Sequence, residues 1–209
     1  MNFIFKSKQR TPAELVKHLR DTIARLDNGS SSNANNNSSS NGNDAALASS
    51  SAGGPSHSNG ANGGAATQGS GGGGSSDSRR KASEDISKTL FQMKAILYGD
   101  GENNEPQPEM VAQLAQEVYN HNMLQLLVQN IWRFEFEAKK DVSQIFNNLL
   151  RRQIGSRLPT VEYLSQKPEI IFIALRGYEN ADVALNTGII LREMLRHEPL
   201  AKILLHSDK

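Results

Sequence analysis

The sequence predicts an all-α protein of the armadillo or HEAT type, a right-handed solenoid in which short helices stack into an α-α superhelix. Apolar residues recur at helical spacing in one segment after another. No segment alternates between apolar and polar residues over a useful length, so no sheet is expected. One helical pattern returns forty-five positions later, from Leu149 to Met194. Repeats of roughly 40–47 residues are typical of armadillo and HEAT proteins.

The segment 138–154 holds the pattern that repeats. Its apolar residues form one stripe on a helix, and a single helix cannot bury such a stripe alone. The segment 183–196 aligns with it, and 85–93 aligns at an offset of fifty-six positions, the separation of Met93 and Leu149. Stacked copies of one helical unit are therefore expected. The aligned pairs are Val142 with Thr187, Ile145 with Ile190, Phe146 with Leu191, Leu149 with Met194, Leu90 with Phe146, and Met93 with Leu149.

The composition excludes several classes of protein. The 209 residues contain no Cys, which excludes a disulfide framework and Cys-ligated zinc. A formal net charge of +1 gives no reason to expect nucleic acid or an acidic membrane as the main partner. No apolar run approaches the roughly 18 residues that a membrane span needs. We expect a soluble intracellular protein with a cytoplasmic location.

Two kinds of sequence alternate along the chain. Residues 28–78 are almost wholly Gly, Ser, Asn and Ala, with Asp44 and Asp77 as the only charges. Such a segment cannot bury enough apolar surface to offset the entropy of ordering. We therefore expect an N-terminal helix of the repeat domain in 1–27, a disordered Gly/Ser/Asn-rich insert in 28–82, and armadillo-like helical repeats in 83–209.

Two helix starts carry capping signals. Thr11 can cap a helix that begins at Pro12, and Glu14 can complete a capping box. Ser83 is expected to cap a second helix that ends at Gly99. Proline, glycine and apolar spacing delimit the others. The expected helices are 12–26, 83–98, 106 or 108 to 120, 123–132, 138–154, 159–164, 170–176, 183–196 and 200–206.

The sequence holds no recognisable catalytic or metal-binding pattern. The five histidines lack the spacing of metal ligands. The glycine run 71–74 has neither the Lys-Ser/Thr pair nor the strand–helix context of a phosphate loop. We expect no enzyme, no cofactor and no bound metal.

The polar side of the repeated helices is a candidate protein-binding surface. Equivalent positions of stacked units line up on one surface, and polar or basic residues recur there in register. Partner binding and plain solvation both stay open as interpretations. If partner binding is correct, replacing Arg151 and Arg196 by Ala should weaken it without lowering the melting temperature. The candidate residues are Lys140, Asn147, Arg151, Arg192 and Arg196.

Ser83 is a candidate phosphorylation site. The run Arg79-Arg80-Lys81-Ala82-Ser83 resembles a target of a basophilic kinase. A phosphate on Ser83 would be favourable at a helix N-terminus. An unmodified cap beside a basic linker explains the same residues and is the commoner case.

Nearly all of the chain outside the insert carries sequence runs that are typical of one family. They are TPAELVK (11–17), VAQLAQE (111–117), KKDVSQIFNNLLRRQIG (139–155), PTVEY (159–163), ALNTGIILRE (184–193) and RHEPLAKIL (196–204). These runs resemble the mouse-protein-25 scaffold family, also called the calcium-binding protein 39 family, whose fungal members include the HymA type.

The resemblance implies an all-helical rod without catalytic activity, monomeric in its full-length form. Relatives bind germinal-centre kinases and STRAD-type pseudokinases and hold them in an active-like conformation. Through a STRAD pseudokinase they also assemble with a liver-kinase-B-type kinase. Fungal members act with a germinal-centre kinase and an NDR-type kinase in signalling for polarised growth, cell separation and conidiophore development. The implied partner is therefore a kinase or pseudokinase of these types.

The chain departs from this family in two ways. The insert replaces a shorter connection, and the chain ends at Lys209, where relatives continue through further repeats. The resemblance therefore implies a truncated, N-terminal portion, without the later pocket for a partner's Trp-Glu-Phe tail. Ile203, Leu204 and Leu205 are expected to form an exposed apolar end. No ligand motif matches the family's calcium name.

A nucleic-acid-binding helical repeat is the alternative function. It would place the basic residues of 151–152 and 192–196 on phosphates. A net charge near zero argues against it. Steep salt dependence of binding to RNA or DNA would support it.

Overall fold

The computed structural model describes residues 10–28, 73–99 and 105–207. Within these ranges the chain forms nine α-helices and two short 3₁₀ helices, with no strand. The sole β-type pairing among the described residues is an isolated bridge between Ile154 and Arg157. The prediction of an all-α protein is confirmed.

The helices follow the predicted order along the chain. Most of their bounds lie close to the predicted ones. The exceptions are the start of α2 and the end of α5. The elements are α1 Pro12–Asn28, α2 Gly73–Tyr98, α3 Pro108–Asn120, α4 Met123–Asn130, η2 Ile131–Arg133, α5 Phe136–Arg151, α6 Pro159–Ser165, α7 Glu169–Arg176, η3 Gly177–Glu179, α8 Ala184–Met194 and α9 Glu198–Leu205.

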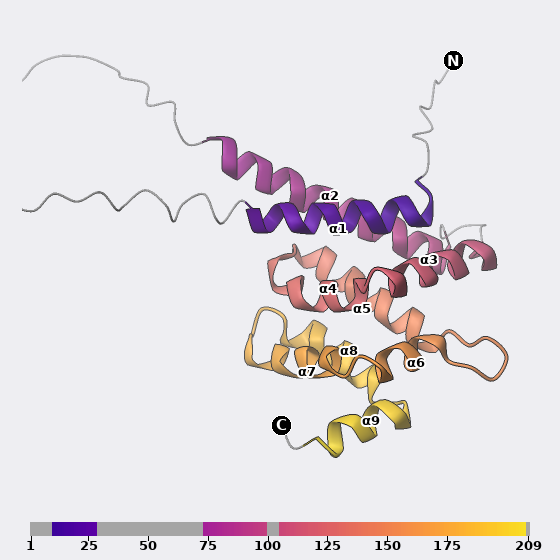
Figure 1. Ribbon diagram of the computed structural model, residues 1–209. Coiled ribbons are helices and arrows are strands. Elements are labelled where there is room, and N and C mark those ends of the chain that lie inside the picture. Colours follow the sequence, from indigo (N-terminus) through magenta and orange to yellow (C-terminus); the bar gives the residue numbers. More distant parts are fainter. Residues whose placement is uncertain (1–9, 29–72, 100–104, 208–209) are drawn as a thin grey trace, which may run out of the picture.

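The helices are layered in succession rather than bundled about one centre (Figure 1). The pair α1 and α2 forms the first layer, α3 to α5 the second, and α6 to α8 the third, with α9 beyond them. Helix α2 packs on α5, which packs on α8, while α4 packs on α7 and α6 packs on α9. Each layer therefore contacts the next through equivalent helices, as the predicted repeat requires.

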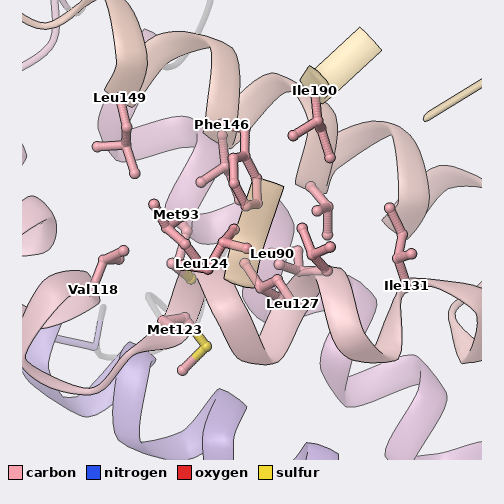
Figure 2. Close-up of a cluster of buried hydrophobic side chains, with 14 of the residues drawn as sticks. Leu90, Met93, Val118, Met123, Leu124, Leu127, Ile131, Phe146, Leu149 and Ile190 are labelled. Atoms are coloured by element: carbon pink, nitrogen blue, oxygen red, sulfur yellow. The ribbon is translucent and has the colours of Figure 1, made fainter. Parts of the chain in front are cut away.

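The residues that the repeat aligns are buried in all three copies. Met93, Leu149 and Met194 are each 0% exposed. Figure 2 shows side chains of α2, α5 and α8 meeting those of α4 in one cluster. Burying a side chain of this size stabilises the fold by about 1.5–3 kcal/mol. The other buried aligned residues are Ile86 with Val142 and Thr187, Thr89 with Ile145 and Ile190, and Leu90 with Phe146 and Leu191.

The predicted capping box at the start of α1 is confirmed. The Glu14 carboxylate accepts a hydrogen bond from the Thr11 backbone N–H at 2.8 Å. In return, the Glu14 N–H donates to the Thr11 hydroxyl oxygen at 3.3 Å. These bonds satisfy two N–H groups that a helix start leaves without a partner in the helix, which fixes the first residue at Pro12.

Helix α2 begins at Gly73, so the prediction that Ser83 caps it is wrong. The side chains of 76–81 are all exposed, and Ala82 is the first buried one. These residues carry no apolar stripe to reveal a helix. They include Arg79, Arg80 and Lys81, residue types that extend a helix once its packed part exists. The rest of the predicted insert, 29–72, lies outside the described residues.

Helix α5 ends at Arg151, three positions before the predicted Ile154. Arg152 adopts an extended conformation with φ −67° and ψ 124°. Ile154 and Arg157 then exchange two backbone hydrogen bonds across Gly155, whose φ is +59°. The backbone N–H and C=O of Ile154 are therefore bonded to Arg157 and do not continue the hydrogen-bond pattern of α5.

Helix α9 shows part of the predicted apolar end. Leu205 is 78% exposed. Ile203 and Leu204 are instead half-buried and pack against the core. The expectation therefore holds for Leu205 and is wrong for the other two residues.

Candidate functional site: a protein-binding surface

Helices α2, α5 and α8 lie side by side and run parallel. Polar contacts join earlier residues of each helix to the start of the next and later residues of each helix to later residues of the next, which requires parallel directions. From α2 towards α5 they are Ser83 to Glu135, Lys94 to Asp141 and Tyr98 to Gln144; from α5 towards α8 they are Lys139 to Asp182, Ser143 to Asn186 and Arg151 to Glu193.

The contact between α5 and α8 includes a two-point ion pair. Arg151 Nε donates to Glu193 Oε1 at 2.7 Å, and Arg151 Nη2 donates to Oε2 at 3.0 Å. The Glu193 side chain is 4% exposed, so the pair satisfies a carboxylate that would otherwise be buried alone. The hydrogen bond from Arg151 holds the pKa of Glu193 below its ordinary value, and nearby Arg196 contributes in the same direction.

The contact between α2 and α5 is built in the same way. Lys94 Nζ lies 2.5 Å from Asp141 Oδ1, and the Asp141 side chain is 8% exposed. Tyr98 donates its hydroxyl to the Gln144 carbonyl at 2.9 Å. Burial raises the pKa of Tyr98, which keeps the phenol protonated as a donor. These polar contacts, Arg151–Glu193 between α5 and α8 and Lys94–Asp141 and Tyr98–Gln144 between α2 and α5, fix the three helices relative to one another, and we call them joints.

The outer side of these helices forms a surface that we call the open face. In the repeat register Phe91 corresponds to Asn147 and Arg192, and Lys140 corresponds to Leu185. Phe91 is 59% exposed and Leu185 is 73% exposed. The open face comprises Glu84, Lys88 and Phe91 on α2, Lys140, Gln144 and Asn147 on α5, and Leu185, Ile189, Arg192 and Arg196 on α8.

Two exposed phenylalanine rings, one on α2 and one on α5, each have a lysine ammonium group over the ring. Lys94 Nζ lies 5.3 Å from the centroid of Phe91, and Lys140 Nζ lies 5.5 Å from that of Phe136. Cations at this distance are attracted to the ring face. The rings thus present apolar area with a defined orientation, and aromatic residues are enriched at protein interfaces.

Helix α8 and η3 form a hollow at the end of the open face. Gly188 allows this shape, because a Cβ there would lie 2.7 Å from the Tyr178 hydroxyl oxygen. Tyr178 is 56% exposed, so its ring is accessible as a wall of the hollow. Apolar walls meet two guanidinium groups here. The lining residues include Tyr178, Leu185, Gly188, Ile189, Arg192 and Arg196.

The structure places the candidate protein-binding residues other than Arg151 in three different settings. Arg192 and Arg196 are exposed and line the hollow together. Lys140 is exposed but bonds Glu137 at 3.0 Å. Asn147 is half-buried, and no hydrogen-bond partner reaches its buried Oδ1.

Arg151 requires a correction. The sequence predicts that replacing Arg151 and Arg196 together by Ala leaves the melting temperature unchanged. The Arg151 guanidinium instead joins α5 to α8 through Glu193. Replacing it would leave that carboxylate buried without its main partner, so a stability cost is expected.

The sequence analysis missed the buried acids Asp141 and Glu193. A signal for Glu193 was present, because it follows Ile190 by three positions and therefore falls on the buried side of its helix. Asp141 likewise precedes the buried Ile145 by four positions. An acid on a buried helix side requires a cationic partner from another element.

Among the described residues, no group of three or more His, Cys, Asp or Glu side chains could hold a metal ion. In the same part of the chain, no helix combines the length and apolar character that crossing a membrane requires.

Comparisons with known proteins show sequence similarity over the segment that contains α2 to α9. The model of the Mo25-like family matches residues 67–209. Calcium-binding protein 39-like of Homo sapiens is 57% identical over 129 residues, covering 62% of this chain and 38% of the relative. The Mo25-like protein of Schizosaccharomyces pombe is 41% identical over 127 residues, covering 61% and 38%.

A further relative is the conidiophore development protein hymA of Emericella nidulans, 33% identical over 133 residues, covering 61% of this chain and 34% of that protein. The chain thus spans 38% of the length of the human relative. The matched region contains α2 to α9 and the whole open face. This chain belongs to the Mo25-like family.

Proposed function

We propose that this chain is a non-catalytic scaffold that binds a protein kinase of the germinal-centre class, or a STRAD-type pseudokinase, through the open face. In a fungal setting the same role would serve an NDR-type kinase pathway in polarised growth, cell separation and conidiation, with a cytoplasmic location. Membership of the Mo25-like family supports a protein partner.

The observation that carries this proposal is the composition of the open face. It combines the exposed apolar residues Phe91 and Leu185 with the guanidinium groups of Arg192 and Arg196. Aromatic residues and arginines dominate the binding energy of protein interfaces. The joints beneath the face hold its helices in one arrangement, so little conformational entropy is lost on binding.

A scaffold of this kind acts by shifting a conformational equilibrium. A partner that alternates between open and closed states is driven towards the state that fits the open face. The shift equals the difference in binding free energy between the two states. A rigid, preformed surface suits this role because it discriminates between partner shapes without rearranging itself.

Binding to the kinase domain of a germinal-centre kinase and to a STRAD-type pseudokinase tests the proposal. Calorimetry should give a saturable one-to-one complex with the intact chain. The double variant L185A/R192A should bind at least about tenfold more weakly, since both residues are exposed and line the hollow.

Residues of similar type and exposure elsewhere provide the control. Leu205 on α9 is 78% exposed, and Arg176 is exposed at the end of α7. The variant R176A/L205A should bind like the unmodified chain. Equal affinities of both double variants, or binding to neither partner, would refute the proposal. Binding of RNA or DNA with steep salt dependence would instead favour a nucleic-acid function.

A further inference from the structure

Ser83 lies where α2 changes from an exposed extension to a packed helix. The side chains of 76–81 are exposed, whereas Ala82 and Ile86 are 5% and 1% exposed. The Ser83 hydroxyl donates to Glu135 Oε1 at 3.2 Å. Glu135 precedes α5, and its carbonyl accepts the Lys139 N–H at 3.0 Å. The Ser83–Glu135 bond therefore joins α2 to the start of α5.

Two arginines lie beside Ser83 on the same side of α2. Arg79 and Arg80 precede it by four and three positions, which are neighbouring positions on a helix surface. Both are exposed, and the contact of Arg80 with Asp77 is a long one of 3.7 Å between exposed groups. Such a contact contributes little, so the guanidinium group can turn to a stronger anion.

The segment can also reach a modifying enzyme. A kinase binds its target in an extended conformation, so the first turns of α2 must unwind. No described side chain between 76 and 81 is buried, and local opening of such an end costs little. Unwinding to Ser83 removes Ala82 from the core but leaves Ile86 and the Lys94–Asp141 contact in place.

We infer that Ser83 is a phosphorylation site for a basophilic kinase and that its phosphate opens the joint between α2 and the start of α5. In the transfer, Ser83 Oγ forms a bond to the γ-phosphorus of ATP. The bond from that phosphorus to the β–γ bridging oxygen breaks, and ADP leaves. The hydroxyl proton passes to the kinase's base.

The phosphate changes the joint in two ways. It removes the hydroxyl proton that Glu135 accepts, and it adds a charge of about −1.5 to −2 next to that carboxylate. The two anions repel each other. Arg79 and Arg80 attract the phosphate along α2 instead. Glu135 is thereby released, and the start of α5 loses its link to α2.

Phosphorylation of the intact chain by the catalytic subunit of a cAMP-dependent kinase, with Mg-ATP, tests the site. Mass spectrometry should find one phosphoryl group on Ser83. It should be absent from S83A and at least about tenfold slower to form in R79A/R80A. The variant S87A, four positions along the same helix, should behave like the unmodified chain. A phosphate elsewhere, or equal rates in R79A/R80A, would overturn the assignment.

Hydrogen exchange tests the consequence. Amides in the first turn of α5 should exchange about fivefold faster after phosphorylation, and those of α8 should not change. In E135Q the amide side chain is neutral and can donate to the phosphate, so phosphorylation should not speed exchange in α5. Unchanged exchange in the phosphorylated chain, or equal acceleration in E135Q, would refute the opening of this joint.

Discussion

Arg151 on α5 holds the buried Glu193 on α8 through two hydrogen bonds of 2.7 and 3.0 Å. One group is 61% exposed and the other 4% exposed, so a surface arginine satisfies an acid in the core. This pair does two things. It fixes the spacing of two successive repeats, and it leaves Arg192 and Arg196 to line the hollow beyond it.

Removing Arg151 should destabilise the fold. In R151A the Glu193 carboxylate stays buried and keeps only the longer 3.5 Å contact to Arg196. We expect the melting temperature to fall by several degrees, because an unsatisfied buried charge is costly. The variant R192A is the control, since its side chain is exposed on the same helix as Glu193. A melting temperature for R151A equal to that of R192A would contradict the structural role of the pair.

The same pair should make stability depend on pH. Because the folded-state pKa of Glu193 is lowered, the pair stabilises the chain fully above the ordinary carboxyl pKa of about 4.3. That stabilisation is lost as the pH falls through the lowered folded-state pKa. The difference in melting temperature between the unmodified chain and E193Q should therefore shrink below about pH 4. A difference that is constant from about pH 7 to about pH 3 would show that the ionised pair contributes nothing.

The joint between α2 and α5 makes a parallel prediction. Replacing Lys94 by Met keeps the aliphatic stem but leaves Asp141, whose side chain is 8% exposed, without its cation. We expect K94M to lower the free energy of unfolding by about 2 kcal/mol in urea titrations. The variant K88M, on the exposed side of the same helix, should change it by less than about 0.5 kcal/mol. Equal values for the two variants would rule out this joint.

A substitution at Gly177 tests the packing of η3 on α8. A Cβ at this position would lie 2.5 Å from Thr187 Oγ1 and Cγ2, and Thr187 is 1% exposed. The threonine is held by its hydroxyl, which donates to the Val183 carbonyl at 3.0 Å. We therefore expect G177A to cost about 1–3 kcal/mol in thermal unfolding.

The variant G155A is the control for G177A. Nothing lies within 4 Å of a Cβ at Gly155, although its φ of +59° disfavours other residues. We expect G155A to cost about 1 kcal/mol through backbone strain alone. If G177A proved less costly than G155A, the close approach of η3 to Thr187 would be wrong.

Much of the fold could be predicted because its information is local. The spacing of Val142, Ile145 and Phe146 defines a helix side within two turns, and the same spacing in α8 reveals the repeat. The capping box of Thr11 and Glu14 is likewise contained in four residues. The aligned helices are then expected to pack on one another, since the apolar stripe of each helix must be covered by another helix.

The remaining features depend on contacts between distant segments. The start of α2 at Gly73 was missed because 73–82 has no apolar period, so only its continuity with a packed helix reveals it. The role of Arg151 was missed for a related reason. A helical pattern shows which residues share a side, but it does not say that Glu193 of the next helix approaches that side. The helical pattern therefore grouped Arg151 with the candidate surface but did not show its pairing with Glu193.

Mapping a bound partner onto the helices would show whether the open face is the binding surface. Hydrogen exchange should be compared between the free chain and its complex with a germinal-centre kinase domain or a STRAD-type pseudokinase. We expect slower exchange along α2, α5 and α8, strongest around the hollow at Leu185 and Arg192, with α3 and α6 unchanged. Protection confined to α3, α6 or α9, with none on the three parallel helices, would contradict it.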